Sequence, residues 1–317
     1  MPANLAARLV ARLVTRLAAA ILAATLSTSI GNGAGAQQPT PRAPRPVAIR
    51  VTTDSTEVQV IRLRDGSSIV GRVVAATPDT VRFASAVGTL AIPREYVTEL
   101  REVERSAVRS GEVWVANPNA TRLLFAPTGR MLAKGEGYFN DTYLFFLNVQ
   151  GGITSRFTLG GGLSIVPFGE FSDNVFFVTP KVGVVASPKF NLAIGGLAGY
   201  VGGLADEGET ANLGVLYAVG TFGSPDASVT IGSGLAYAGG QFADTPVAML
   251  GAEKRIGRRV SFVTENYLLP NEEVPSILSY GLRFFGEKLS VDLALWNMPG
   301  EDAVFPGIPY VAFSVVF

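Results

Sequence analysis

Residues that could carry chemistry are few in this chain, and the missing types exclude most enzyme sites. Among its 317 residues there is no cysteine and no histidine. The chain can therefore form no disulfide, no Cys/His zinc site and no catalytic triad with a histidine base. The charged residues of most interest are Lys181, Glu265, Arg283 and Asp292, because each stands inside a strand-like pattern of apolar and small residues.

These four residues fall on the polar face of their strands. Lys181 shares its face with Thr179 and Gly183, and Asp292 shares its face with Ser290. Side chains of a strand alternate between two faces, so the charges are predicted to point away from the apolar side. Charges inside a barrel are costly unless paired, so they form either an ion-pair network that fills the interior or the lining of a pore. We assign no catalytic residue, no metal site and no cofactor.

Antiparallel β-strands over residues 112–317 are the elements that would position these charges. This region holds 18 of the 19 phenylalanines and both tryptophans, which indicates a surface in contact with something apolar. No apolar run is long enough for a membrane-spanning helix, whereas about twelve segments could be tilted strands that cross a bilayer. Ten strands would also fit, and a soluble β-sandwich is an alternative because it would alternate too. The segments are 122–127, 138–149, 157–167, 174–186, 190–204, 211–222, 228–239, 246–255, 259–269, 277–285, 289–297 and 306–317.

The connections between these segments favour a membrane barrel over a sandwich. Short turns alternate with longer loops, as in outer-membrane barrels that have short periplasmic turns. Region 112–317 has 12 basic and 18 acidic residues, and the two signs collect at opposite ends of the predicted strands. Acidic outer loops would attract cations. The basic residues at the short turns are Arg156, Lys189, Arg255, Arg258, Arg259 and Lys288, and the acidic residues at the longer loops are Glu170, Asp173, Asp206, Glu207, Glu209, Asp244, Glu272, Glu273, Glu301 and Asp302.

The last strand carries the most specific pattern in the chain. Val311, Phe313, Val315 and Phe317 form an apolar stripe with a period of two that ends on the C-terminal phenylalanine. This stripe resembles the terminal β-signal of outer-membrane proteins, which the barrel-assembly machinery recognises by strand pairing. The resemblance implies that machinery and outer-membrane lipid as partners.

The N-terminus is typical of a cleaved export signal. Residues 1–36 combine three arginines, an apolar block at 17–26 and a cleavage pattern with Ala34 and Ala36. The arginine spacing would also suit a mitochondrial presequence, but the Ala-x-Ala site and the compact apolar block favour bacterial secretion. Residues 37–47 are rich in proline, which predicts an extended linker.

Residues 48–108 predict a small β domain made of short β-branched segments. Asp65-Gly66 lies between two of them and is a strong hairpin signal. The pattern over 61–73, followed by 87–93, resembles the small SH3-like or Sm-like barrels appended to bacterial envelope proteins. Sm proteins bind RNA, which an exported chain would not meet, so we predict no nucleic-acid partner and favour a spacer or a module for an unknown periplasmic partner. The predicted strands are 58–64, 68–75, 80–84, 89–92 and 96–102.

Residues 112–317 as a whole resemble uncharacterised bacterial outer-membrane β-barrels, on stretches such as 157–162 and 264–267. The expected fold is all-β: a transmembrane antiparallel barrel in the bacterial outer membrane, preceded by a small SH3-like barrel in the periplasm. We predict a passive channel for small solutes with a modest cation preference, and not an enzyme. The alternative is a closed barrel that serves as an envelope anchor or scaffold, whose periplasmic domain binds a partner.

Overall fold

The computed structural model describes residues 49, 51, 56–165, 174–201, 211–269, 276–299 and 306–317. Its contacts divide the chain into two units, with the boundary between Ala116 and Asn117. The predicted cleavage site at Ala34 and Ala36, the linker at 37–47 and every predicted acidic loop residue except Asp244 lie outside the described residues. Within the described ranges, no helix has the length and apolar character that a membrane span requires.

The first unit is built on a five-stranded antiparallel sheet, as the sequence predicts. Its strands are β1 (Glu57–Leu63), β2 (Ser68–Ala76), β3 (Thr80–Ser85), β4 (Gly88–Pro93) and β5 (Val97–Glu104), in the order β4-β3-β2-β1-β5. The 3-10 helix η1 (Arg94–Tyr96) precedes β5; η2 (Arg105–Ala107) and the short pair β6 (Val108–Arg109) and β7 (Glu112–Val113) follow it. Ile61, Val73, Val81 and Phe83 form the buried centre. The likeness to SH3-like or Sm-like barrels stays a prediction.

The hairpin predicted at Asp65-Gly66 is confirmed. It joins β1 to β2, which pair in register from Arg62 and Ser68, and Gly66 has a positive φ of 85° that the tight turn needs. The carboxylate of Asp65 accepts hydrogen bonds from the hydroxyl of Ser67 at 2.7 Å and from its backbone N–H at 2.9 Å. These two bonds lower the pKa of Asp65.

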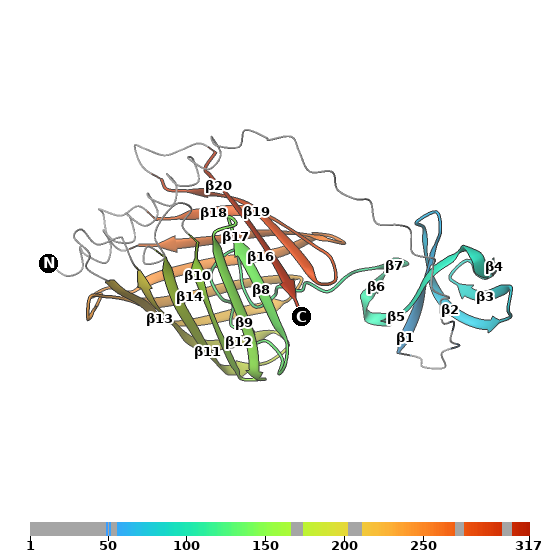
Figure 1. Cartoon of the computed structure of the whole chain (residues 1–317), viewed down its shortest axis with the longest axis horizontal. Coiled ribbons are helices and arrows are strands. Elements are labelled where there is room, and N and C mark those ends of the chain that lie inside the picture. The colour runs from blue at the N-terminus through green and yellow to red at the C-terminus, as the bar shows by residue number, and fades with distance from the viewer. Residues whose placement is uncertain are drawn as a thin grey trace. The chain divides into compact units, whose positions relative to one another are not determined.

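The second unit is a closed antiparallel barrel of twelve strands (Figure 1). Each strand pairs with its neighbours in the chain, β13 pairs with β14, and β20 returns to pair with β8, which closes the sheet. The two-residue strand β15 (Gln241–Phe242) is a small addition beside β14. The barrel strands are β8 (Gly137–Thr142), β9 (Phe146–Thr154), β10 (Phe157–Ser164), β11 (Val175–Ala186), β12 (Phe190–Val201), β13 (Ala211–Ser224), β14 (Ala227–Ala238), β16 (Val247–Gly257), β17 (Val260–Leu268), β18 (Leu278–Phe285), β19 (Leu289–Asn297) and β20 (Ile308–Val316).

The predicted number of twelve strands is right, but two of the predicted segments were wrong. Segment 122–127 is not a barrel strand; it makes only the isolated bridge Arg122–Pro127. Segment 138–149 is two strands, because Tyr143 and Leu144 turn the chain with φ values of 60° and 66°. Positive φ is uncommon for such bulky residues. No glycine, asparagine or proline stands at these two positions to mark the turn, so the sequence did not predict it. The two errors cancel in the count.

The outer face of the barrel is apolar on all sides, as a surface in contact with lipid must be. Aliphatic side chains are strongly exposed there; Leu216 is 58% and Ile231 is 54% exposed. By strand parity, outward aromatic side chains flank this aliphatic belt near both ends of the strands, as in the aromatic girdles of membrane barrels. They are Phe157, Phe190, Phe222, Phe262, Phe284 and Phe317 towards the short turns, and Phe176, Tyr200, Tyr237 and Tyr280 towards the longer loops.

The C-terminal stripe lies on this outer face and beside the closing seam. Val311, Val315 and Phe317 are exposed, whereas the alternate residues Ala312 and Ser314 are buried inside. Beyond the paired strands, the backbone of Phe317 donates to Gly137 O at 2.9 Å and accepts from Gly137 N at 3.1 Å. The last residue therefore extends the ladder that joins β20 to β8 (Figure 1). Its recognition by the barrel-assembly machinery stays a prediction.

Candidate functional site: a plugged barrel lumen

Residues 117–133, which we call the plug, lie inside the barrel. Leu123 and Leu124 are fully buried and pack in one cluster with Val219, Val263 and Tyr310, which come from β13, β17 and β20. At this place the sequence predicted a strand of the wall. The run 122–127 is apolar like a buried strand. It is buried because the barrel encloses it, and it is not one of the barrel strands.

The plug is a hairpin whose two ends lie at the short-turn end of the barrel. Thr128 N donates to Thr121 O at 2.9 Å, and Leu123 N donates to Ala126 O at 2.8 Å, which makes 123–126 the tip. The first arm starts near the ends of β19 and β20, where the Asn119 side-chain amide contacts Ser314 Oγ at 3.1 Å. After the second arm, Gly135 N donates to Gly152 O at 2.9 Å, close to the β9–β10 turn.

Arg283 and Asp292 form the centre of a buried ion network that holds the first arm. Both are fully buried, and they face each other across β18 and β19. Asp292 accepts from Arg283 Nε at 2.7 Å and from its Nη2 at 3.0 Å, in the bidentate geometry that suits a guanidinium and a carboxylate. Arg122 of the plug binds the same carboxylate at 2.8 Å. The aspartate thus joins the wall to the plug.

The guanidinium of Arg283 also binds the main chain of the plug. Its Nη1 donates to the carbonyl oxygens of Asn119 and Arg122, both at 3.2 Å, and its Nη2 donates to Leu123 O at 2.5 Å. A second carboxylate, Glu253 on β16, accepts from Nη1 at 3.1 Å. All of the arginine's charge is therefore met by two carboxylates and three plug carbonyls, which is what a buried charge requires.

Glu265 binds the tip of the plug. It is 1% exposed, and its Oε2 accepts from the backbone N–H groups of Phe125 and Ala126 at 2.9 and 3.0 Å. Its Oε1 accepts from the hydroxyl of Tyr267 at 2.7 Å. Tyr310 completes the contact, because its hydroxyl donates to Leu124 O at 2.7 Å.

Lys181 binds the second arm from the opposite side of the barrel. Its ammonium group donates to Arg130 O at 2.7 Å and to Thr128 O at 3.3 Å. The structure therefore brings Glu265, Arg283 and Asp292 together around the first arm and the tip, and places Lys181 apart from them. All four point inward, and each binds the plug, so none of them lines an open pore in this structure.

Glycines let the plug approach the wall closely. A Cβ atom at Gly129 of the plug would collide with the carbonyl oxygen of Asn191 on β12. A Cβ atom at Gly251 on β16 would collide with Cδ1 of Leu123 at the tip. A side chain at Gly129 therefore requires the backbone to shift, whereas a side chain at Gly251 requires only that Leu123 turn away or be replaced.

Arg122 and Glu253 belong to the network, and the sequence reasoning missed both. Arg122 lay in a segment that was taken for a wall strand. Glu253 could have been found by parity, because it shares the inner face of β16 with Met249 and Gly251 while Leu250 and Ala252 face outward. Arg255 lies near the β16–β17 turn; its side chain is buried and binds Asp226, in the β13–β14 turn, at 3.0 Å.

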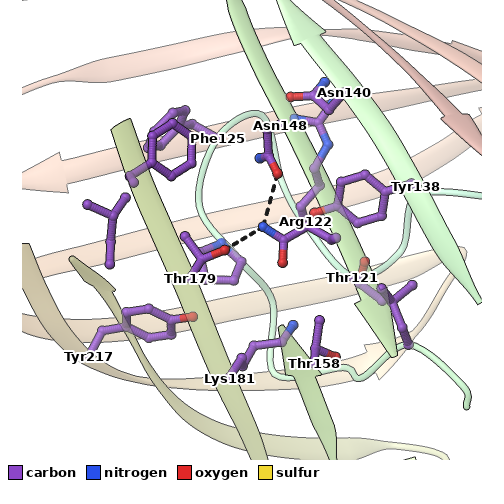
Figure 2. A pocket seen from close by; sticks show the side chains of 15 residues that line it. Thr121, Arg122, Phe125, Tyr138, Asn140, Asn148, Thr158, Thr179, Lys181 and Tyr217 are labelled. Carbon is purple, nitrogen blue, oxygen red and sulfur yellow. Dashed lines mark hydrogen bonds between the residues drawn. The ribbon is translucent and has the colours of Figure 1, made fainter. Parts of the chain in front are cut away.

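A cavity of about 90 Å³, lined by both polar and apolar side chains, remains between the plug and the wall of β8–β13 (Figure 2). Gln150 spans part of it, donating to Asn148 Oδ1 at 3.0 Å and to Thr179 Oγ1 at 2.6 Å. Figure 2 shows Thr121 and Arg122 reaching it from the plug, and Lys181, Thr158 and Tyr217 from the strands. The opposite wall is packed against the plug.

Comparisons with known proteins return similar barrels and no family. No protein-family model and no curated protein matches the chain. A "KdgM porin" structure is 10% identical and covers 57% of this chain and 96% of its own, with a TM-score of 0.41. Outer membrane phospholipase A from Escherichia coli is 9% identical over 59% of this chain and 90% of its own, with a TM-score of 0.34. A loop-deletion mutant of OmpT, an outer membrane protein of Vibrio cholerae, is 12% identical over 83% of this chain and 97% of its own, with a TM-score of 0.32. Likenesses this distant say nothing of activity, and the strand pairing alone defines the barrel.

Proposed function

We propose that the protein is a gated passive channel for small solutes in the bacterial outer membrane, closed by the plug in this structure. The observation that carries the proposal is the polar inner wall, which would line a water-filled lumen once the plug moved. It is a long row of polar and charged side chains on nearly every strand: Asn140, Gln150, Thr158, Lys181, Thr221, Ser228, Thr230, Glu253, Ser261, Glu265, Ser279, Arg283, Ser290, Asp292 and Ser314.

A polar inner wall offers no advantage to a barrel that is permanently closed. Buried ion pairs are often no more stable than well-packed apolar side chains of similar volume. A barrel that never opened could therefore be filled with apolar residues at no loss of stability. A wall that must accept water in one state and the plug in another needs the polar groups that it has. The cation preference expected from the acidic loops stays a prediction.

The second candidate is a sealed barrel that anchors the N-terminal domain in the envelope. The observation that favours it is the filling of the lumen, because the plug is held from both sides and the cavity beside it has only about 90 Å³. In that case the activity would belong to the N-terminal domain and its partner. The two candidates differ in one measurable property, which is whether loosening the plug opens a path for ions.

The test is the conductance of residues 37–317, which follow the predicted signal peptide, refolded in detergent and inserted into planar bilayers. Glu265→Ala removes the acceptor of two N–H groups at the plug tip without changing the ion network around Arg283. Hydrogen bonds to a charged group contribute about 1.5–3 kcal/mol each, so plug opening should increase by at least tenfold. We expect rare openings in the native chain and frequent ones in the variant.

A disulfide lock supplies the control. Leu123→Cys and Gly251→Cys, added to Glu265→Ala, place two thiols where the tip meets the wall, in a chain that has no other cysteine. Oxidation should silence the current and reduction should restore it. Folded Glu265→Ala barrels that stay silent would refute the channel and support the sealed anchor. Current that ignores the lock would show that ions do not pass through the plugged lumen.

A further inference from the structure

The cavity beside the plug has the charge of an anion site. Two of its lining residues, Arg122 and Lys181, are cationic, and none of the fifteen is an aspartate or a glutamate. Arg122 is neutralised from outside the cavity by Asp292 at 2.8 Å. Lys181 makes no ion pair with any residue that the structure describes and binds only two plug carbonyls. A buried ammonium group without a counter-ion is costly.

Two hydroxyl groups at the same cavity have no partner. The side chain of Thr158 is 2% exposed, and its Oγ1 makes no hydrogen bond within the described part of the chain; the same is true of Thr121 Oγ1. Both residues line the cavity. Buried hydroxyls are almost always satisfied by the protein, by ordered water or by a bound molecule, so these two groups are donors that water or a small molecule in the cavity would satisfy once the side chains turn towards it.

The strand register brings Thr158, Lys181 and Tyr217 close together. Thr158 on β10 lies directly opposite Lys181 on β11. On the other side of Lys181 is Gly195, whose lack of a side chain leaves room for the hydroxyl of Tyr217, 2.5 Å from where a Cβ atom would be. Figure 2 shows the Lys181 ammonium group turned towards the cavity, with Thr158 beside it.

We propose that this cavity binds a small oxyanion of the size of acetate or nitrate. Its negative charge would meet the Lys181 ammonium group, and its oxygens would accept hydrogen bonds from the hydroxyls of Thr158 and Thr121 after these two side chains rotate towards the cavity. A volume of about 90 Å³ holds a few water molecules or an anion of a few heavy atoms. The proposal concerns binding in the folded barrel, so it does not depend on whether the barrel conducts.

Thermal unfolding in the presence of acetate tests the proposal. Residues 37–317, which follow the predicted signal peptide, are refolded in a zwitterionic detergent, and their Tm is measured against sodium acetate at constant ionic strength kept with sodium gluconate, a much larger carboxylate. A ligand that binds only the folded state raises the Tm in a saturable way. We expect that rise in the native chain, with nitrate acting as acetate does.

Two cavity variants and one matched control decide the outcome. Lys181→Met should abolish the rise, and Thr158→Val, which keeps the shape of the side chain, should weaken the apparent affinity about tenfold. Lys134→Met removes an exposed lysine outside the cavity and should change nothing. If Lys181→Met fails to fold, Thr158→Val decides alone. A rise that Thr158→Val leaves unchanged, or no saturable rise in the native chain, would overturn the proposal and leave a cavity that holds water.

Discussion

Charged side chains of the barrel wall bind main-chain groups of the plug: the cationic side chains bind carbonyl oxygens, and a carboxylate binds N–H groups. Arg283 and Lys181 donate to plug carbonyls, and Glu265 accepts from plug N–H groups. A hairpin whose tip is removed from water has main-chain groups that need partners, and side chains of the right charge supply them. The sequence identified these three residues and Asp292 as inward charges. It did not show that they bind a segment of the same chain, because no pattern links residue 122 to residue 292.

Asp292 should be the most sensitive of the four to substitution. Asp292→Ala would leave Arg283 with one carboxylate and Arg122 with none, and both guanidinium groups are buried. Removing one partner of a buried ion pair costs about 3–5 kcal/mol. We expect a loss of this size in urea unfolding of the detergent-refolded chain. Asp244→Ala, at an exposed residue, is the control; similar losses in the two variants would contradict the network.

Among the elements, the strands were predictable and the plug was not. Alternation gave the inner and outer faces of β11, β18 and β19, and the turn residues gave most of the boundaries. The hairpin at Tyr143 and Leu144 was not predicted, because no turn sequence marks it. Tyr143 is held there by bonds of its N–H to Val311 O at 3.0 Å and of its hydroxyl to Pro309 O at 2.8 Å. The plug escaped for a related reason: a short apolar run reads as a strand whether it joins a sheet or is enclosed by one.

The plug itself should be displaced by a single methyl group. Gly129→Ala places a Cβ atom against the backbone carbonyl of Asn191, which cannot rotate away. The plug arm must then move from the wall, so trypsin should cleave the folded barrel after Arg122 and Arg130 at least tenfold faster. Gly220→Ala is the control, because its Cβ atom would make only ordinary contacts of 3.5 Å or more. Equal cleavage in the two variants would show that the plug does not depend on this close approach.

Within the whole molecule, the barrel and the plug are expected to differ in stability. Hydrogen-bonded ladders run around the complete barrel, including its seam, whereas side chains hold most of the plug. Regions held by fewer cooperative contacts open at lower free energy. The plug also begins at Asn117, directly after the first unit ends in the chain. The N-terminal domain, and any partner bound to it, is therefore connected to the plug directly through the peptide bond between Ala116 and Asn117.

Urea should accordingly release the plug before it unfolds the barrel. We expect trypsin cleavage after Arg130 to appear at a lower urea concentration than the loss of the heat-modifiable barrel band on a gel. The oxidised Leu123→Cys and Gly251→Cys lock should bring the two transitions together. Coincident transitions in the native chain would mean that plug and barrel form one cooperative unit.

The seam between β8 and β20 also has a consequence for the speed of folding. The plug lies just before the first barrel strand, yet its partners come from the last ones: Arg122 is separated from Asp292 by 170 residues and Asn119 from Ser314 by 195. Contacts so distant along the chain have a high loop-closure entropy and form late, which makes a fold slow to complete. The C-terminal strands must therefore either close around a plug that is already in place, or form first, with the plug entering through the short-turn end afterwards. In either order, insertion of the plug is expected to be the slow step of folding.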